Sequence, residues 1–226
     1  MKITTRHALR LGSMLLGAAF SLAAVARPTN MQELVHETQR MSEEDSYMTM
    51  VWWIPQEFWE ASLAGNPRVT PAQRADLLSA LEDLQIVALL RGKLGIGGIT
   101  DVPPLEDLVA HARFELNGKV LLPLDAEKIS VGAQTVLATL KPLVSGMLGQ
   151  FGKGIQFVVY PSKQDNQRLI DPKKPGSFDY TLFDQSFHWR LPLASLLPMK
   201  IDPKTKEEFP GNFDFNPYTG GKLSSR

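Results

Sequence analysis

The sequence predicts an α+β protein, a mainly antiparallel sheet with helices packed on one face, that ends in a small ribbon-like hairpin. Segments rich in β-branched and aromatic residues follow one another in pairs, and several of them alternate apolar and polar positions, which favours antiparallel hairpins. Asn117-Gly118 stands between two of these segments and is the strongest short hairpin signal. At least three helical patterns lie among them, and no sequence repeat spans the elements.

Start signals mark the predicted helices. Asn30 begins a short first helix as a capping residue. Pro55 fits the first turn of a second helix, where its missing N–H costs no hydrogen bond. Thr70-Pro71 begins a third helix, and Gln73 completes a capping box there. A longer helix is expected over residues 131–148, with one face lined by Val136, Leu140, Leu143 and Met147.

The predicted strands are short segments that are either continuously apolar or alternating. They cover residues 47–54, 85–90, 94–100, 109–116, 119–122, 155–160, 178–182 and 187–191. We expect Gly92-Lys93 to turn the second of these strands back into the third. The segment 161–176 is polar and interrupted by prolines, which predicts a loop.

Charge and cysteine content exclude several classes of protein. The 226 residues carry 24 lysines and arginines against 24 aspartates and glutamates, which argues against a nucleic-acid-binding protein with a basic surface. The chain contains no cysteine. Disulfide scaffolds, thiol catalysts, cysteine-ligated metal sites and lipid anchors on cysteine are therefore excluded.

Residues 1–26 have the composition of a secretory signal peptide. The basic residues Lys2, Arg6 and Arg10 precede an apolar stretch, residues 14–26, that ends in the small-residue site Ala24-Val25-Ala26. This stretch is short for a membrane-spanning helix, which needs about 20 apolar residues. We expect a bacterial protein exported to the periplasm or the extracellular space, without a transmembrane segment after cleavage. An uncleaved amphipathic N-terminal helix is the alternative.

N-terminal sequencing of the exported protein should find Arg27 as its first residue. Ala24 and Ala26 satisfy the small-residue requirement of the cleavage site, and Arg27-Pro28 starts a non-helical stretch. Soluble cytoplasmic protein that retains Met1 would contradict the predicted export.

Three of the four tryptophans, Trp52, Trp53 and Trp59, lie within eight residues of one another. The cluster is a candidate ligand-binding platform, because exposed rings stack on sugars or hold apolar ligands. Trp52 and Trp53 are neighbours on a predicted strand, so they point to opposite faces of the sheet and cannot form one flat platform. The pattern therefore favours core residues at the junction between a strand and a helix.

A candidate catalytic cluster comes from two alternating strands. His111, Arg113 and Glu115 share one face of the segment 109–116, and His188 and Arg190 share one face of the segment 187–191. If these strands are near neighbours, the five side chains can bind an anion or transfer protons. The alternative is the solvent face of an antiparallel sheet, with its charges paired across strands.

The C-terminal residues repeat a short pattern. Asp202-Pro203-Lys204-Thr205 and Asn216-Pro217-Tyr218-Thr219 echo each other fourteen residues apart, with an aromatic segment between them. The arrangement resembles a zinc ribbon, in which two Cys-Pro-x-Cys-Gly knuckles are bridged by an aromatic hairpin. The resemblance puts Asp202, Thr205, Asn216 and Thr219 at the ligand positions. None of them is cysteine or histidine, and Lys206 stands where the first knuckle usually has glycine.

We expect this tail to form a hairpin that holds no zinc, because structural zinc sites are closed shells of thiolates and imidazoles. Asp or Asn before proline accepts hydrogen bonds from backbone N–H groups two or three residues on, so hydrogen-bonded turns can replace metal knuckles. Phe209, Phe213, Phe215 and Tyr218 are expected to supply apolar contact. An irregular, frayed C-terminus with two unrelated turns is the alternative.

These features divide the chain into a signal peptide over 1–26, an α+β domain over 27–198 and a ribbon-like tail over 199–226. The main domain resembles uncharacterised bacterial secreted proteins, and this resemblance implies no activity. No known catalytic motif occurs. We expect an exported, non-catalytic binding protein of the cell envelope that uses no cofactor and whose partner is an envelope protein or polymer. The alternative is a hydrolase or other enzyme built on the His/Arg/Glu cluster.

Overall fold

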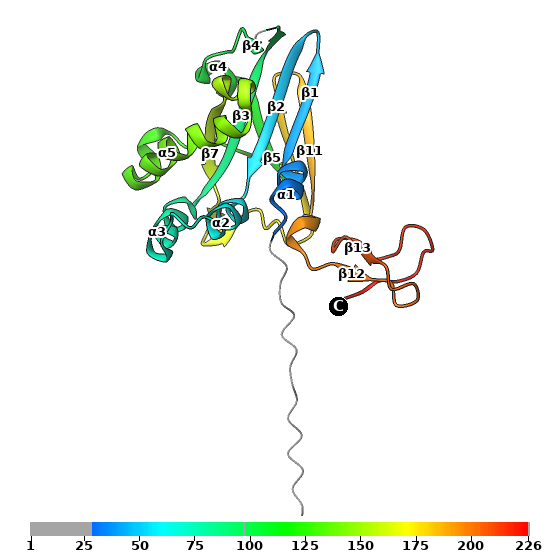
Figure 1. Ribbon diagram of the computed structural model, residues 1–226. Coiled ribbons are helices and arrows are strands. Elements are labelled where there is room, and N and C mark those ends of the chain that lie inside the picture. The colour runs from blue at the N-terminus through cyan, green and yellow to red at the C-terminus, as the bar shows by residue number, and fades with distance from the viewer. Residues whose placement is uncertain (1–28, 97, 226) are drawn as a thin grey trace, which may run out of the picture.

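A computed structural model that describes residues 29–96 and 98–225 confirms the α+β class. The predicted signal peptide lies outside the described residues. In Figure 1 a layer of helices lies on one side of a first antiparallel sheet, and a second antiparallel sheet lies on the other side. The tail, residues 199–225, extends away from one end of these layers.

The first sheet is built around the long strand β3. Its strands follow the order β1-β2-β3-β4, and β7 pairs with the first half of β3 on the edge that β4 occupies further along. The strands are β1 (Gln39–Glu44), β2 (Tyr47–Ile54), β3 (Leu84–Gly95), β4 (Gly98–Thr100) and β7 (Gln156–Pro161). Strand β2 is buried along nearly its whole length because both of its faces are covered, which explains its continuous apolar sequence.

The second sheet has the strand order β11-β10-β5-β6. Its strands are β5 (Ala112–Leu116), β6 (Lys119–Leu121), β10 (Gly176–Leu182) and β11 (Gln185–Leu191). Asn117 and Gly118 take φ angles of 52° and 74°, as a two-residue hairpin turn requires, so the predicted hairpin is confirmed. Two further strands, β8 (Lys163–Gln164) and β9 (Gln167–Arg168), form a short hairpin inside the predicted polar loop.

The helices are α1 (Met31–Thr38), α2 (Gln56–Ala64), α3 (Pro71–Leu81), α4 (Leu105–Ala110) and α5 (Val131–Met147). Their start signals work as predicted: the Asn30 side chain caps α1, and Thr70 and Gln73 form both hydrogen bonds of a capping box on α3. The face predicted for α5 is correct for Val136 and Leu140, which pack against the core, and wrong for Leu143 and Met147, which are exposed. A helix in an outer layer buries only one narrow stripe, which here consists of Ala133, Leu140 and Val144.

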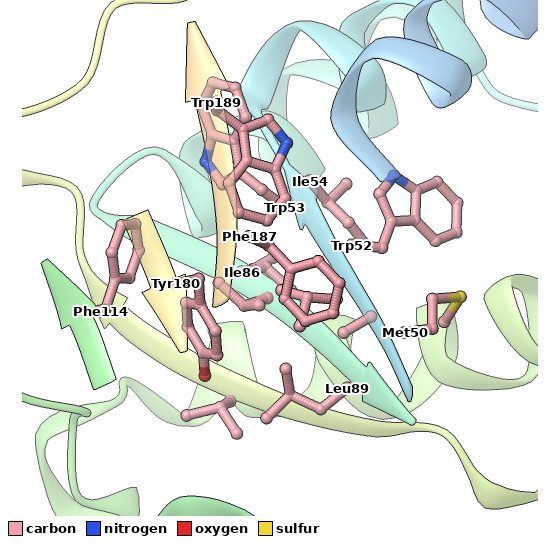
Figure 2. Close-up of a cluster of buried hydrophobic side chains, with 14 of the residues drawn as sticks. Met50, Trp52, Trp53, Ile54, Ile86, Leu89, Phe114, Tyr180, Phe187 and Trp189 are labelled. Atoms are coloured by element: carbon pink, nitrogen blue, oxygen red, sulfur yellow. The ribbon is translucent and has the colours of Figure 1, made fainter. Parts of the chain in front are cut away.

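The core lies between the two sheets and continues through the first sheet to the helices (Figure 2). Trp53 meets Phe178 of the second sheet edge to face at 4.9 Å, and Phe178 stacks on Trp189 at 5.0 Å. The hydroxyl groups of Tyr160 and Tyr180 share a buried hydrogen bond of 2.8 Å. Burial raises the pKa of Tyr160 to about 12, so this phenol stays neutral at physiological pH.

Two predicted strand boundaries are wrong. Gly92 is not a turn, since β3 runs through it to Gly95; a Cβ atom there would overlap with the side chain of Ile99 on β4, so glycine permits close strand approach. The segment 109–116 does not start as a strand. Helix α4 occupies its beginning, after the prolines at 103 and 104, and His111 caps that helix before β5 starts.

The segment that leads to the tail is fixed to the main domain by the buried side chain of Leu193 and by the carboxylate of Glu37. Glu37, near the end of α1, accepts hydrogen bonds from the backbone N–H groups of Ala194 and Ser195 at 2.7 and 2.9 Å. Strands β12 (Lys200–Ile201), β13 (Glu208–Phe209) and β14 (Ser224–Ser225) then form the small sheet of the tail, with β12 in the centre.

Candidate functional site: the C-terminal tail

The three clustered tryptophans lie in the core. Trp52 and Trp53 are 0 % exposed and Trp59 is 3 % exposed. Trp53 points toward the second sheet, whereas Trp52 points toward the helices, where it donates a hydrogen bond to Thr38 and meets Phe58 edge to face (Figure 2). The rings fill the junction between β2 and α2, and they present no open platform to a ligand.

Four of the five residues of the His/Arg/Glu cluster lie on the solvent side of the second sheet, Arg113 and Glu115 on β5 and His188 and Arg190 on β11. Strand β10 lies between β5 and β11, so the strands that carry these residues are not neighbours. His188 Nδ1 lies 2.7 Å from Asp179 Oδ1 on β10, and Arg113 donates to Glu115 on its own strand at 3.0 Å. Arg190, on β11, lies opposite Ser177. Exposed pairs of this kind are typical of the wet face of an antiparallel sheet.

His111 is separated from the other four residues. It follows α4, its ring stacks on Phe183 at 4.3 Å, and its Nδ1 atom lies 2.8 Å from the carbonyl oxygen of Asp107. Two hollows found in the described part of the chain are lined by other residues. The geometry therefore does not bring the five side chains around one reacting atom.

Two further observations limit what the described residues can do. They contain no group of three or more His, Asp or Glu side chains placed to hold a metal ion. No helix among residues 29–96 and 98–225 combines the length and apolar character that crossing a membrane requires.

The first knuckle of the tail is a hydrogen-bonded turn around Asp202. One carboxylate oxygen of this buried residue accepts from the backbone N–H groups of Lys204 and Thr205 at 2.8 and 3.3 Å. The backbone carbonyl of Asp202 accepts from the N–H of Lys206, whose φ angle is 64°. The hydroxyl of Thr205 accepts from the N–H of Glu207.

The second knuckle repeats each of these bonds around Asn216. The side-chain oxygen of this buried residue accepts from the N–H groups of Tyr218 and Thr219 at 2.9 and 3.3 Å. Its backbone carbonyl accepts from Gly220, whose φ angle is 70°, and the hydroxyl of Thr219 accepts from Gly221. Lys206 thus takes the left-handed conformation that Gly220 takes at the equivalent place.

A single buried contact joins the two knuckles. The Asn216 amide donates to the second carboxylate oxygen of Asp202 at 2.6 Å, across fourteen residues of sequence. Because the acceptor is a carboxylate, this hydrogen bond is charge-assisted. This bond, together with the backbone N–H groups of Lys204 and Thr205, lowers the pKa of Asp202, so the carboxylate is ionised at neutral pH.

The aromatic side chains of the tail do not all pack inward as expected from the sequence. Phe209 is buried, but Phe213, Phe215 and Tyr218 are 39, 58 and 86 % exposed. In the described part of the chain, all the exposed large aromatic residues lie within residues 213–218. Sequence reasoning missed them, although Tyr218 sits at the tip of a predicted turn, where a side chain faces solvent.

The segment that carries the rings is held by hydrogen bonds. The N–H group of Phe213 donates to the carbonyl oxygen of Pro210 at 3.0 Å, and that of Tyr218 donates to the side-chain oxygen of Asn216. Phe215 pairs with Lys222 in an isolated antiparallel β-bridge. Lys200 forms an ion pair with Asp214 at 2.8 Å between the two phenylalanines. The backbone that carries the three rings is therefore ordered. Binding of a ligand to an ordered segment costs less conformational entropy than binding to a flexible one.

Comparison of the chain with models of protein families, with curated proteins and with solved structures found no match.

Proposed function

We propose that the protein is an exported, non-catalytic binding protein of the cell envelope, and that its tail holds an envelope polysaccharide. The observation that carries this proposal is the confinement of the exposed aromatic rings to Phe213, Phe215 and Tyr218. Water-exposed rings on a fixed backbone are costly to solvate and gain most from a partner that covers them.

A polysaccharide fits this surface better than a globular protein does. A protein interface of standard size covers about 800 Å² on each partner around a buried centre. Here the three exposed rings lie within six residues of sequence, and the polar side chains of Asn212, Asp214 and Thr219 are exposed among them. A sugar chain matches this alternation, because its rings carry C–H faces that pack on aromatic rings and hydroxyl groups that form hydrogen bonds.

Removing one ring should weaken binding without unfolding the protein. Purified mature protein should co-sediment with purified peptidoglycan sacculi, and Tyr218→Ala or Phe215→Ala should each weaken this binding about tenfold, the equivalent of about 1.4 kcal/mol. Both rings are mostly exposed, and the Tyr218 ring only tilts against the buried Phe209 at 6.4 Å, so we expect their truncation to change binding more than stability.

The control is His188→Ala, which removes an exposed side chain from the second sheet and should leave co-sedimentation unchanged. Failure of the wild-type protein to bind sacculi, or binding that survives both ring substitutions, would contradict the proposal. Loss of binding in the His188 variant alone would move the site to the second sheet.

A further inference from the structure

A hollow lies at the end of the second sheet where strand β11 finishes. It has a volume of about 470 Å³ and is bounded by the turn between β5 and β6, by the start of β10, by the end of β11 and by residues of the segment 167–175. Pockets that bind small molecules have volumes of about 300–1,000 Å³, so this hollow has room for a small organic molecule. The described residues that line it include no aromatic side chain, so its chemistry differs from that of the tail.

A glycine on β10 contributes to this space. Gly176 lies on the same side of the strand as the buried residues Phe178 and Tyr180, because side chains alternate along a strand. Among the described residues, a Cβ atom on Gly176 would meet only the side chain of Leu191, at 3.9 Å. A glycine inside a strand often marks a place where a ligand or another backbone approaches closely, and here the chain leaves that place open.

Arg168 lines the hollow and is held in place by a carboxylate. Its Nη1 and Nη2 atoms donate to the two oxygens of Glu57 on α2 at 2.7 and 2.8 Å, and the Glu57 side chain is only 8 % exposed. A guanidinium group carries five N–H donors in one plane. Glu57 uses one pair of donors, which leaves the Nε–H group and a neighbouring N–H group as a second parallel pair. Because the ion pair already fixes the arginine, binding of a second anion costs little further conformational entropy.

The other two charged residues that line the hollow pair with each other. One oxygen of Asp171 lies 3.3 Å from Lys174 Nζ, and the other accepts from the backbone N–H of Lys173 at 2.9 Å. Lys174 is 78 % exposed and can turn toward a ligand, since an exposed ion pair contributes little to stability. Each positive charge thus has one carboxylate partner within the chain, so the hollow favours a ligand with one negative charge over a dianion.

We propose that this hollow binds a small organic carboxylate. Its two oxygens accept from the second donor pair of Arg168, with Lys174 beside them, and its apolar part lies against Ile170 and Leu191, which are 2 and 7 % exposed. A carboxylate matches a guanidinium group well, because both are planar and form two parallel hydrogen bonds. The site is separate from the aromatic rings of the tail, so it does not depend on the proposed binding of a polysaccharide.

Titration of the mature protein, residues 27–226, with sodium hexanoate tests this proposal. Hexanoate at millimolar concentration should shift the NMR signals of the Ile170 and Gly176 amides in a saturable manner. Hexanol has a similar apolar chain without the charge, and inorganic phosphate has charge without the chain, so each should bind at least about tenfold more weakly. Absence of saturable shifts with hexanoate, or equal binding of hexanol or phosphate, would overturn the proposal.

Two variants locate the bound carboxylate. Arg168→Lys keeps a positive charge beside Glu57 but removes the second donor pair, and Gly176→Val places a side chain beside Leu191 in the hollow. Each should weaken hexanoate binding at least about tenfold. The matched control is Lys173→Gln, which removes a charge next to Lys174 from a residue that does not line the hollow, and it should bind hexanoate as the wild type does. Signals of the buried tryptophans show whether each variant is folded. Binding that both folded variants retain, or that the control loses equally, would contradict a site at Arg168.

Discussion

Replacing Trp53 with alanine should destabilise the protein by about 3–5 kcal/mol, the usual cost of removing a large ring from a core. Trp53 is fully buried between the two sheets, meets Phe178 at 4.9 Å, and donates to the buried side chain of Gln85 at 2.7 Å. The substitution leaves both a cavity and an amide oxygen without its donor, and these two costs add. Chemical denaturation, with the free energy of unfolding as the readout, measures the effect.

Two further variants separate the contribution of the buried ring from that of its hydrogen bond and from that of an exposed ring. Trp53→Phe retains an aromatic ring but removes the donor to Gln85, so it should cost less than alanine does. Tyr218→Ala truncates a ring that is 86 % exposed and should change stability by less than about 0.5 kcal/mol. Unchanged stability of Trp53→Ala would mean that the two sheets do not pack on this ring.

Substituting Asn216 with aspartate should reverse the pH dependence of the tail. In the wild type, the bond from Asn216 lowers the pKa of Asp202, with help from the N–H groups of Lys204 and Thr205. A lowered pKa in the folded state means that the carboxylate stabilises the tail above about pH 3.9, the value for an unfolded chain. This stabilisation is lost as the pH falls through the folded pKa, so the wild-type tail should loosen only in acid.

Asn216→Asp places a second carboxylate against that of Asp202. Two carboxylates in contact cannot both be ionised without repulsion, which raises one pKa. The tail should therefore open at least about tenfold more often at pH 7, the effect of one pKa unit, and should close again in mild acid, where the pair shares a proton. Hydrogen exchange at the amides of Tyr218 and Thr219 reports this opening, because both donate to residue 216.

The control for this prediction is Asn212→Asp. It adds the same charge to the tail at an exposed position that makes no hydrogen bond to Asp202. Its exchange rates should follow the wild-type pH dependence. If Asn216→Asp exchanged as slowly as the wild type at pH 7, the contact between the knuckles would not hold the tail.

Features that depend on neighbouring residues could be predicted from the sequence. The Asn117-Gly118 hairpin and the capping box of α3 each arise from interactions within a few positions. Strand β2 could be predicted because its continuous apolar sequence reflects burial on both faces. The turns at Asp202 and Asn216 belong to the same group, since each side chain bonds to N–H groups two and three residues on.

Features that depend on contacts across the fold could not be predicted. His111 was assigned to a strand because alternation does not reveal the helix that ends there. The buried stripe of α5 is set by what lies beneath the helix, and apolar Leu143 gives no sign of its side. The bond between Asp202 and Asn216 joins two turns that lie fourteen residues apart, so neither turn alone reveals it.

The hydrogen bond between Asp202 and Asn216 joins the two knuckles of the tail, and we expect it to hold them together without a metal. The most direct test is the hydrogen-exchange protection of the Tyr218 and Thr219 amides at pH 7, with and without a zinc chelator. We predict equal protection in both conditions, because every bond of the two knuckles comes from the chain itself. Loss of protection when the chelator is added would show that a bound metal holds the tail, and would contradict a tail held by its own hydrogen bonds.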